Sequence, residues 1–394
     1  MAIHPGPHRP RVLIFLVLYP LLAFGCGKGK SGEPVGPATL GSTLEGAALQ
    51  YLDEAGPAAR AGLQSGDLIE AIDYDPVEGR CGLERALRER KPGEEVKLTI
   101  RRGPESFEKT VELANALDLD GPACDLGRAA ACRRLGILYA TGAGVPVDPQ
   151  RAADLYQRAC NRGNADACAD LGMVHLQSTS MARARGLFEK ACDGGSAAGC
   201  AHLAYVYATG QDVPQDDVRA LALYGEACDA GDAAGCYNVG LHYEKGRGTA
   251  PNLGAALSLY GVACDLGSYL GCTNQGFLYE KGLGTSLDSA RAAELYRRAC
   301  EGNPCEPGDP IGCFNLGVMY RDGYGVGLDK SEAARYFGLS CDKGNAFGCA
   351  NLADLLYAGD GVAKDEKRAL DLFRQACEGG HAVSCRNVES IEKR

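Results

Sequence analysis

Cysteine is the residue type with chemical potential that recurs most regularly in this chain. It accounts for 19 of the 394 residues. Seven pairs have their members eight residues apart: Cys124/Cys132, Cys160/Cys168, Cys192/Cys200, Cys228/Cys236, Cys264/Cys272, Cys341/Cys349 and Cys377/Cys385. The pairs return about every 36 residues, with one shorter and one longer interval. Such self-similarity at a fixed period indicates a repeat protein.

Paired thiols can form disulfides, bind a metal or remain as buried free thiols. Zinc sites usually combine closely spaced cysteines with histidines, and neither feature recurs here. We therefore expect disulfides, no metal and no cofactor, and disulfides require an oxidising compartment. Each bridge would close a loop of about nine residues and contribute roughly 2.5 kcal/mol on the chain-entropy model.

An eighth pair ends at Cys313, and its partner is ambiguous. Cys300 is in register with the other repeats, whereas Cys305 stands eight residues before Cys313. We favour Cys300, which leaves Cys305 over.

The elements that position the cysteines are predicted to be two helices per repeat. In the first helix, Cys132, Leu135 and Tyr139 form one apolar stripe, and Gly136 beside it permits close packing. An aromatic residue precedes the cysteine of the second helix by four positions throughout, as Tyr156 does. Each cysteine pair would then join the second helix of one repeat to the first helix of the following repeat.

Helix caps support these boundaries. Expected N-caps of the second helices are Asp148, Ser180, Asp216, Asn252, Asp288, Asp329 and Asp365. Expected N-caps of the following first helices are Asn164, Ser196, Asp232, Ser268 and Asn345. Glycine three residues after most second-helix cysteines is a C-cap signal.

These features resemble Sel-one-like repeats, which are relatives of the tetratricopeptide family. The cysteine-paired form is similar to the Hcp-type bacterial cysteine-rich proteins. The motifs LG-x-x-Y, G-x-G-V, D-x-x-x-A and Y-x-x-A-C stand in register over residues 119–394, although the second repeat lacks G-x-G-V and the segment 302–307 adds five residues. The resemblance implies a mainly α fold, an α/α solenoid of about seven repeats plus a C-terminal half-repeat.

The Hcp-type resemblance also implies a β-lactamase-like activity, which requires S-x-x-K, S-D-N and K-T-G motifs. Ser340-Cys341-Asp342-Lys343 matches the first motif, but it lies at a repeated helix end. Lys30-Ser31-Gly32 matches the third loosely, and S-D-N does not occur. We expect no catalytic residues.

One column of residues suggests binding instead. Two residues after the first-helix cysteine stand Asn238, Asn274, Asn315, Asn351 and Asn387. Asparagine can donate to and accept from an extended peptide backbone, so these side chains could line one solenoid face. The alternative is that they bond neighbouring helices and stabilise their stacking.

Residues 38–114 have a different period and are predicted to form a small α+β domain. The segments 56–69 and 91–103 resemble PDZ domains of the bacterial HtrA type, with one helix at Leu83–Arg90. The resemblance implies that an extended peptide adds as a strand, its carboxylate held by the loop Thr39, Leu40, Gly41 and Ser42. The alternative is a domain that packs on the solenoid and binds nothing. Cys81 is expected to be a small buried side chain.

The first 25 residues are typical of a signal peptide, because the apolar run Val12–Phe24 is short for a membrane span. Leu22-Ala23-Phe24-Gly25-Cys26 resembles a bacterial lipoprotein cleavage site, which would make Cys26 the lipidated first residue. Ordinary cleavage after Gly25 is the alternative. Residues 26–37 would form a flexible tether.

We therefore predict a cell-envelope adaptor or scaffold lipoprotein that binds envelope proteins or peptides and reaches the membrane through its N-terminal lipid. Gly27 gives no inner-membrane retention signal of the Asp type, which favours the outer membrane, facing the periplasm or the cell surface. Nucleic acid is not an expected partner, because the net charge is -10 and no basic block occurs. The rival hypotheses are a β-lactamase-like or peptidoglycan-directed hydrolase and a structural spacer.

Overall fold

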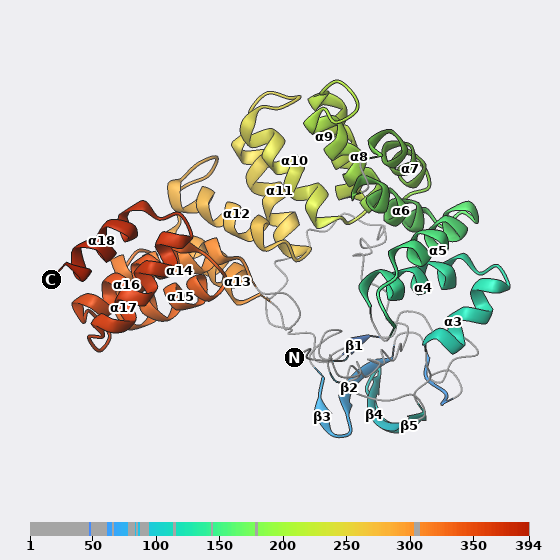
Figure 1. The fold of residues 1–394 in the computed structure, drawn as a ribbon, viewed down its shortest axis with the longest axis horizontal. Coiled ribbons are helices and arrows are strands. Elements are labelled where there is room, and N and C mark those ends of the chain that lie inside the picture. Colours follow the sequence, from blue (N-terminus) through green and yellow to red (C-terminus); the bar gives the residue numbers. More distant parts are fainter. Residues whose placement is uncertain are drawn as a thin grey trace, which may run out of the picture. The chain divides into compact units, whose positions relative to one another are not determined.

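The structure is a computed structural model of the 394-residue chain (Figure 1). It describes residues 47–48, 61–64, 67–77, 83, 86, 94–112, 116–142, 145–177, 180–302 and 308–393. The predicted signal peptide, Cys26, the tether, Cys81 and Cys305 lie outside these residues. Two compact units divide the chain. One runs to Val206 and includes Gln211–Val213, and the other comprises Tyr207–Gly210 and Pro214–Arg394.

A small antiparallel sheet precedes the helices. Its strands are β1 (Ala47–Ala48), β2 (Leu68–Ile72), β3 (Asp75–Pro76), β4 (Glu95–Arg102) and β5 (Glu105–Glu112). The strand order is β1-β2-β4-β5, and β3 pairs with β2. Val96, Leu98 and Ile100 alternate along β4 and are completely buried with Ile69 and Ile72 of β2. Alternation of this kind places one face of a strand in the core.

A partly buried ion pair joins Asp67, just before β2, to Arg102 at the end of β4. The Arg102 guanidinium donates through Nε to Asp67 Oδ1 at 2.6 Å and through Nη2 to Asp67 Oδ2 at 2.7 Å. The backbone N–H of Gln64 also donates to Asp67 Oδ2, at 2.8 Å. These hydrogen bonds, those of Arg102 first, hold the pKa of Asp67 below its usual value.

The rest of the described chain consists of helices in the predicted alternation. The first helices of the repeats, called A helices here, are α4 (Ala129–Thr141), α6 (Ala165–Gln177), α8 (Ala197–Thr209), α10 (Ala233–Lys245), α12 (Tyr269–Lys281), α14 (Pro310–Asp322), α16 (Ala346–Ala358) and α18 (Ala382–Glu392). The second helices, called B helices, are α5 (Pro149–Asn161), α7 (Met181–Asp193), α9 (Asp217–Asp229), α11 (Leu253–Asp265), α13 (Ser289–Glu301), α15 (Lys330–Asp342) and α17 (Glu366–Glu378). One further helix, α3 (Ala116–Asp125), stands before α4 in the B position.

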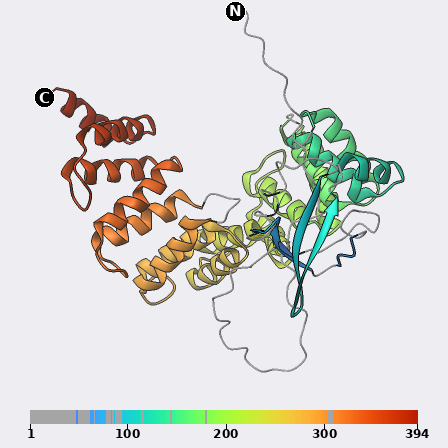
Figure 2. The same cartoon turned by 90° about the horizontal axis from the view of Figure 1, so that it is seen from below.

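Consecutive helices contact one another from α3 to α7 and again from α9 to α18, and Figure 2 shows the orange and red helices of the C-terminal unit following one another in sequence order. Among the described residues, no helix combines the length and the apolar character that crossing a membrane requires.

Glycine on the A helix lets the aromatic ring of the B helix approach closely. A Cβ atom added to Gly240 would lie 2.7 Å from the Tyr260 ring, and one added to Gly317 would lie 2.7 Å from the Phe337 ring. The same contact joins Gly136 to Tyr156, so the close packing predicted there is confirmed. Only a residue without a side chain fits at these positions.

The predicted caps are present with one exception. The side chains of Asp148, Asp216, Asn252, Asp288, Asp329 and Asp365 accept backbone N–H bonds from the first turn of the following helix. Ser180 stands before α7 as predicted, but its side chain makes no capping bond. Its backbone angles (φ −100°, ψ 65°) differ from those of Asp148 (φ −139°, ψ 89°), so the hydroxyl is not aimed at the first turn.

Eight disulfides link the end of one B-type helix to the next A helix. The bridges are Cys124–Cys132, Cys160–Cys168, Cys192–Cys200, Cys228–Cys236, Cys264–Cys272, Cys300–Cys313, Cys341–Cys349 and Cys377–Cys385. Cys313 is therefore joined to Cys300, across a sequence separation of 13 instead of 8. The Cα–Cα distance there is 4.4 Å, against 4.6 Å for Cys264–Cys272, so the longer segment leaves the junction unchanged.

Candidate functional site

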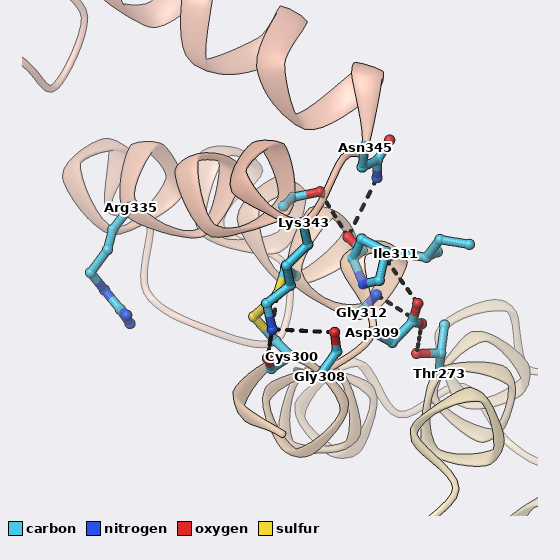
Figure 3. The surroundings of a disulfide bond; sticks show 12 residues. Thr273, Cys300, Gly308, Asp309, Ile311, Gly312, Arg335, Lys343 and Asn345 are labelled. Atoms are coloured by element: carbon cyan, nitrogen blue, oxygen red, sulfur yellow. Dashed lines mark hydrogen bonds between the residues drawn. A yellow bond between two sulfur atoms is a disulfide. The ribbon is translucent and has the colours of Figure 1, made fainter. Parts of the chain in front are cut away.

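The S-x-x-K sequence at the end of α15 holds two repeats together. Ser340 is completely buried, and its Oγ donates to the Pro310 carbonyl at 2.7 Å. Lys343 Nζ donates instead to the carbonyls of Cys300, at 2.7 Å, and Gly308, at 3.2 Å (Figure 3). The serine and the lysine therefore donate hydrogen bonds to different backbone carbonyls. The buried serine hydroxyl is not accessible as a nucleophile. The loose match at residues 30–32 lies outside the described residues.

The cap of α14 lies beside this junction. Asp309 accepts from the N–H groups of Ile311 and Gly312 at 3.1 Å each, and from the Thr273 hydroxyl. Figure 3 shows Thr273 reaching Asp309 from the preceding A helix. The desolvated position of Lys343 lowers the pKa of its ammonium from the usual value. These contacts stabilise the junction that carries the five additional residues.

The predicted asparagine column is the sixth residue of five successive A helices. It consists of Asn238 in α10, Asn274 in α12, Asn315 in α14, Asn351 in α16 and Asn387 in α18. All five side chains are half-buried. The repeat therefore places one amide at the same point of each A helix.

The contacts of these amides differ along the column. Asn238 Nδ2 donates to the Ala234 carbonyl of its own helix at 2.8 Å. Asn274 Nδ2 lies 3.4 Å from the Tyr237 hydroxyl of the preceding repeat. Asn351 accepts from Arg321 Nη1 at 2.9 Å and donates to the Phe347 carbonyl at 2.9 Å. Asn351 thus uses both ends of its amide within the protein.

A tyrosine–glutamate pair lies under two members of the column. Tyr260 OH donates to Glu244 Oε2 at 2.6 Å, and Tyr296 OH donates to Glu280 Oε2 at 2.7 Å. Burial and the neighbouring carboxylate raise the pKa of both tyrosines, so they stay protonated donors. The amides of Asn274 and Asn315 oppose part of this shift, because they lower the pKa of Tyr260 and of Tyr296, respectively.

Sequence reasoning missed a row of apolar side chains beside the column. Leu270, Ile311, Phe347 and Val383 are 47%, 50%, 56% and 47% exposed. Each stands four residues before a column asparagine, which places it on the same helix face one turn away. Large apolar side chains exposed in a row mark interaction surfaces. The sequence signal was available, because the same position in the four preceding A helices holds Ala or Asp.

A pocket of about 410 Å³ opens next to this row in the C-terminal unit. Its apolar lining consists of Leu287, Phe314, Val318, Met319 and Tyr324. Its polar lining consists of Glu280, Lys281, Ser289 and Asn315. The Phe314 ring lies 6.1 Å from the Phe347 ring, so the pocket and the exposed row form one surface.

The sheet domain supplies a second candidate site. The loop Thr39 to Ser42, predicted to hold a peptide carboxylate, lies outside the described residues. Among the described strands, β1 pairs only with β2 and forms one edge of the sheet. An exposed strand edge is the place where a peptide strand can add.

Comparison with protein families gives two matches. The PDZ domain family matches residues 37–113. The Sel1 repeat family matches seven successive segments: 129–164, 165–196, 197–232, 233–268, 269–304, 310–345 and 346–381. The repeat matches together cover more than half of the chain.

Similar proteins agree with this division. A DegP-like periplasmic serine endoprotease of Halomonas elongata is 35% identical over 71 residues, which are 18% of this chain and 15% of that protein. A protective antigen of uropathogenic Escherichia coli with an SLR fold is 26% identical, with a TM-score of 0.59, over 69% of this chain and 58% of that one. A Sel1 repeat protein from Oxalobacter formigenes is 24% identical, with a TM-score of 0.58, over 70% of this chain and 80% of that one.

Proposed function

Because the chain belongs to the Sel1 repeat family and carries a PDZ domain, we propose that it is a protein-binding adaptor of the bacterial cell envelope. PDZ domains bind extended peptides, and repeat solenoids present long surfaces to their partners. The observation that carries the proposal is the row of exposed apolar side chains beside the asparagine column on the A helices. It offers apolar contact and amide hydrogen bonds on one face.

An envelope location is part of the proposal. Eight disulfides suit an oxidising compartment. The DegP-like endoprotease of Halomonas elongata, to which part of the chain is similar, is periplasmic, which supports the same location. We propose that residues 1–25 direct export, that Cys26 is lipidated, and that residues 26–37 tether the folded part to the outer membrane.

The binding residues belong to the proposal as well. The loop Thr39, Leu40, Gly41 and Ser42 would hold a peptide carboxylate at the PDZ domain. The solenoid face would use Asn238, Asn274, Asn315, Asn351 and Asn387. The hydrolase alternative gains no support at Ser340 and Lys343, because a buried serine that donates to a carbonyl is not an activated nucleophile.

Cross-linking in intact cells tests the adaptor. Partners captured by the full-length protein and by a variant lacking Ala38–Ala114 would be identified by mass spectrometry. One discrete envelope protein captured only by the full-length form would support the adaptor and assign recognition to the PDZ domain. Capture that survives the deletion would assign recognition to the solenoid, and reproducible capture of nothing would contradict the proposal.

The asparagine column has its own test. Replacing Asn274 and Asn315 together by Ala should weaken capture of the partner while the melting temperature stays close to that of the wild type. Asn351→Ala is the comparison variant: Asn351 belongs to the same column, but it bonds Arg321 and the Phe347 carbonyl, so its replacement should lower the melting temperature. An equal loss of stability in both variants would mean that the column serves only helix stacking.

A further inference from the structure

We propose that the pocket between α12, α13 and α14 is an anchor site for one large, neutral, apolar side chain on an extended peptide segment of a partner protein. The inference rests on the proposed adaptor function and specifies what its solenoid surface recognises. Nothing in the similarity to other proteins assigns this pocket a ligand.

The shape and lining of the pocket suit one bulky side chain. Its volume of about 410 Å³ lies at the small end of the range for ligand sites. Phe314, Val318 and Met319 of α14 and Leu287 before α13 give it apolar walls. Met319 is almost completely buried, so this part of the lining belongs to the core and is held in place.

The polar groups at the rim neutralise one another. Glu280 accepts from Tyr296 OH through Oε2 and from Lys281 Nζ through Oε1. Each carboxylate oxygen therefore already has a donor, and the charge of Lys281 is balanced. A charged side chain entering the pocket would lose its hydration without gaining an opposite charge. The pocket therefore favours a neutral occupant.

The next repeat shows why the pocket is open at this place. Ser289 begins α13 and Tyr324 follows α14. Their counterparts one repeat later are Lys330 and Asp360, whose side chains form an ion pair at 2.6 Å. The counterpart of Phe314 there is Ala350. The place where Ser289 and Tyr324 line the pocket is thus occupied in the next repeat by the salt bridge between Lys330 and Asp360.

The surface beyond the pocket indicates a peptide. From Phe314, ring contacts continue to Phe347 at 6.1 Å and from Phe347 to His381 at 5.2 Å. Ile311 and Phe347 expose half or more of their side chains along this path. Asn315 beside the path can hydrogen-bond to a backbone amide. A ligand with several apolar side chains on a polar chain matches this arrangement better than a compact small molecule.

The experiment selects peptides on the purified, oxidised full-length protein from a display library of random nonapeptides. We expect enriched sequences to share one large apolar residue with uncharged neighbours. A labelled enriched peptide is then titrated into two double variants and the wild type. Ser289→Lys with Tyr324→Asp copies the salt bridge of the next repeat into the pocket and should weaken binding by about tenfold or more.

Leu253→Lys with Leu283→Asp is the matched control, because it introduces the same two charged side chains at the counterpart positions one repeat earlier. It should leave the affinity within about twofold of the wild type, which is 0.4 kcal/mol or less. Circular dichroism and thermal unfolding establish that both variants keep the helical fold.

Two results would overturn the anchor site. One is an affinity unchanged by Ser289→Lys with Tyr324→Asp in a folded protein, and the other is a selection that returns charged central residues or no consensus. Either result leaves the adaptor function to be decided separately by the cross-linking experiment. A failed cross-linking experiment combined with a successful selection would remove the envelope role while retaining a peptide site.

Discussion

The PDZ domain and the repeats are stabilised by different means. The described part of the PDZ domain has a core of branched side chains from β2 and β4 and a partly buried ion pair between Asp67 and Arg102. The repeats bury alanine, cysteine and leucine together with at least one aromatic side chain per B helix, and a disulfide crosses every junction between a B-type helix and the next A helix. The comparison teaches that small local cores in a repeat array depend on covalent links, whereas a sheet domain depends on contacts between distant segments.

This difference follows from what each region can bury. A repeat contacts only its neighbours, so its stability is a sum of small local terms. A close glycine–aromatic contact, such as Gly240 with Tyr260, buries the ring of the B helix completely, but the apolar area buried in this way is confined to one repeat and its neighbours. Hydrophobic burial scales with that area, so a bridge of about 2.5 kcal/mol is a large part of what holds one junction.

Reducing the disulfides should produce the largest difference in stability between the repeats and the PDZ domain. Because net domain stability is only about 5–15 kcal/mol, losing several bridges should unfold the repeats while the PDZ sheet persists. Thermal unfolding followed by far-ultraviolet circular dichroism should lose its helical transition in dithiothreitol, and the β4 and β5 amide signals should stay dispersed in NMR spectra. Repeats that unfold at the same temperature with and without reductant would refute the comparison.

Removing one disulfide at a time should lower the stability of the repeats by an amount that depends on the length of the loop that the disulfide closes. Replacing Cys264 and Cys272 by Ser should cost about 2.5 kcal/mol, and replacing Cys300 and Cys313 should cost about 3 kcal/mol, because the second loop is longer. Urea unfolding monitored by circular dichroism measures both. A smaller loss at the longer loop would show that the chain-entropy argument does not govern this junction.

Acid should affect the PDZ domain through its ion pair. The pKa of Asp67 is lowered in the folded state, so its contribution is present above the unfolded value of about 3.9 and is lost as pH falls through the folded value. Asp67→Asn should remove roughly 1.5–3 kcal/mol near neutral pH and abolish that part of the acid sensitivity. Unfolding of the β4–β5 amides between pH 2 and 7 tests this, and an unchanged pH profile in the variant would contradict it.

The smallest effect is expected from shortening the long junction. Deleting residues 303–307 leaves Cys300-Glu301-Gly302-Gly308-Asp309-Pro310-Ile311-Gly312-Cys313, which restores the eight-residue spacing. Since the Cα–Cα distance of 4.4 Å lies within 0.4 Å of the distance in every regular junction, stability should change by less than about 0.6 kcal/mol, the cost of doubling a loop. Non-reducing peptide mapping should still join Cys300 to Cys313. A loss comparable to that of a missing bridge would mean that these residues have a structural role.

The periodic parts of the molecule could be predicted from the sequence. The helix pairs, the caps at Asp148 and its counterparts, and the Gly136–Tyr156 contact follow from local patterns that recur in each repeat. The Asp67–Arg102 pair joins residues 35 positions apart, which no local pattern reveals. The pocket was missed because it arises where repeats differ, at Ser289 and Tyr324, and a repeat pattern describes only what the repeats share.

The placement of the bridges also bears on how the chain oxidises. In each regular junction the correct partner of a cysteine is also the nearest one in sequence, eight residues away. The next pair begins 24 residues further on from Cys168 to Cys192 and 28 residues further on elsewhere, as from Cys132 to Cys160. Short loops close fastest, so these bridges can form correctly as soon as each junction leaves the export machinery. Cys313 is the exception, because Cys305 stands nearer in the chain than Cys300 and competes for it. If Cys305 pairs with Cys313 first, thiol exchange with Cys300 is required to reach the native bridge, so this is the junction of the repeats at which a disulfide isomerase would matter first.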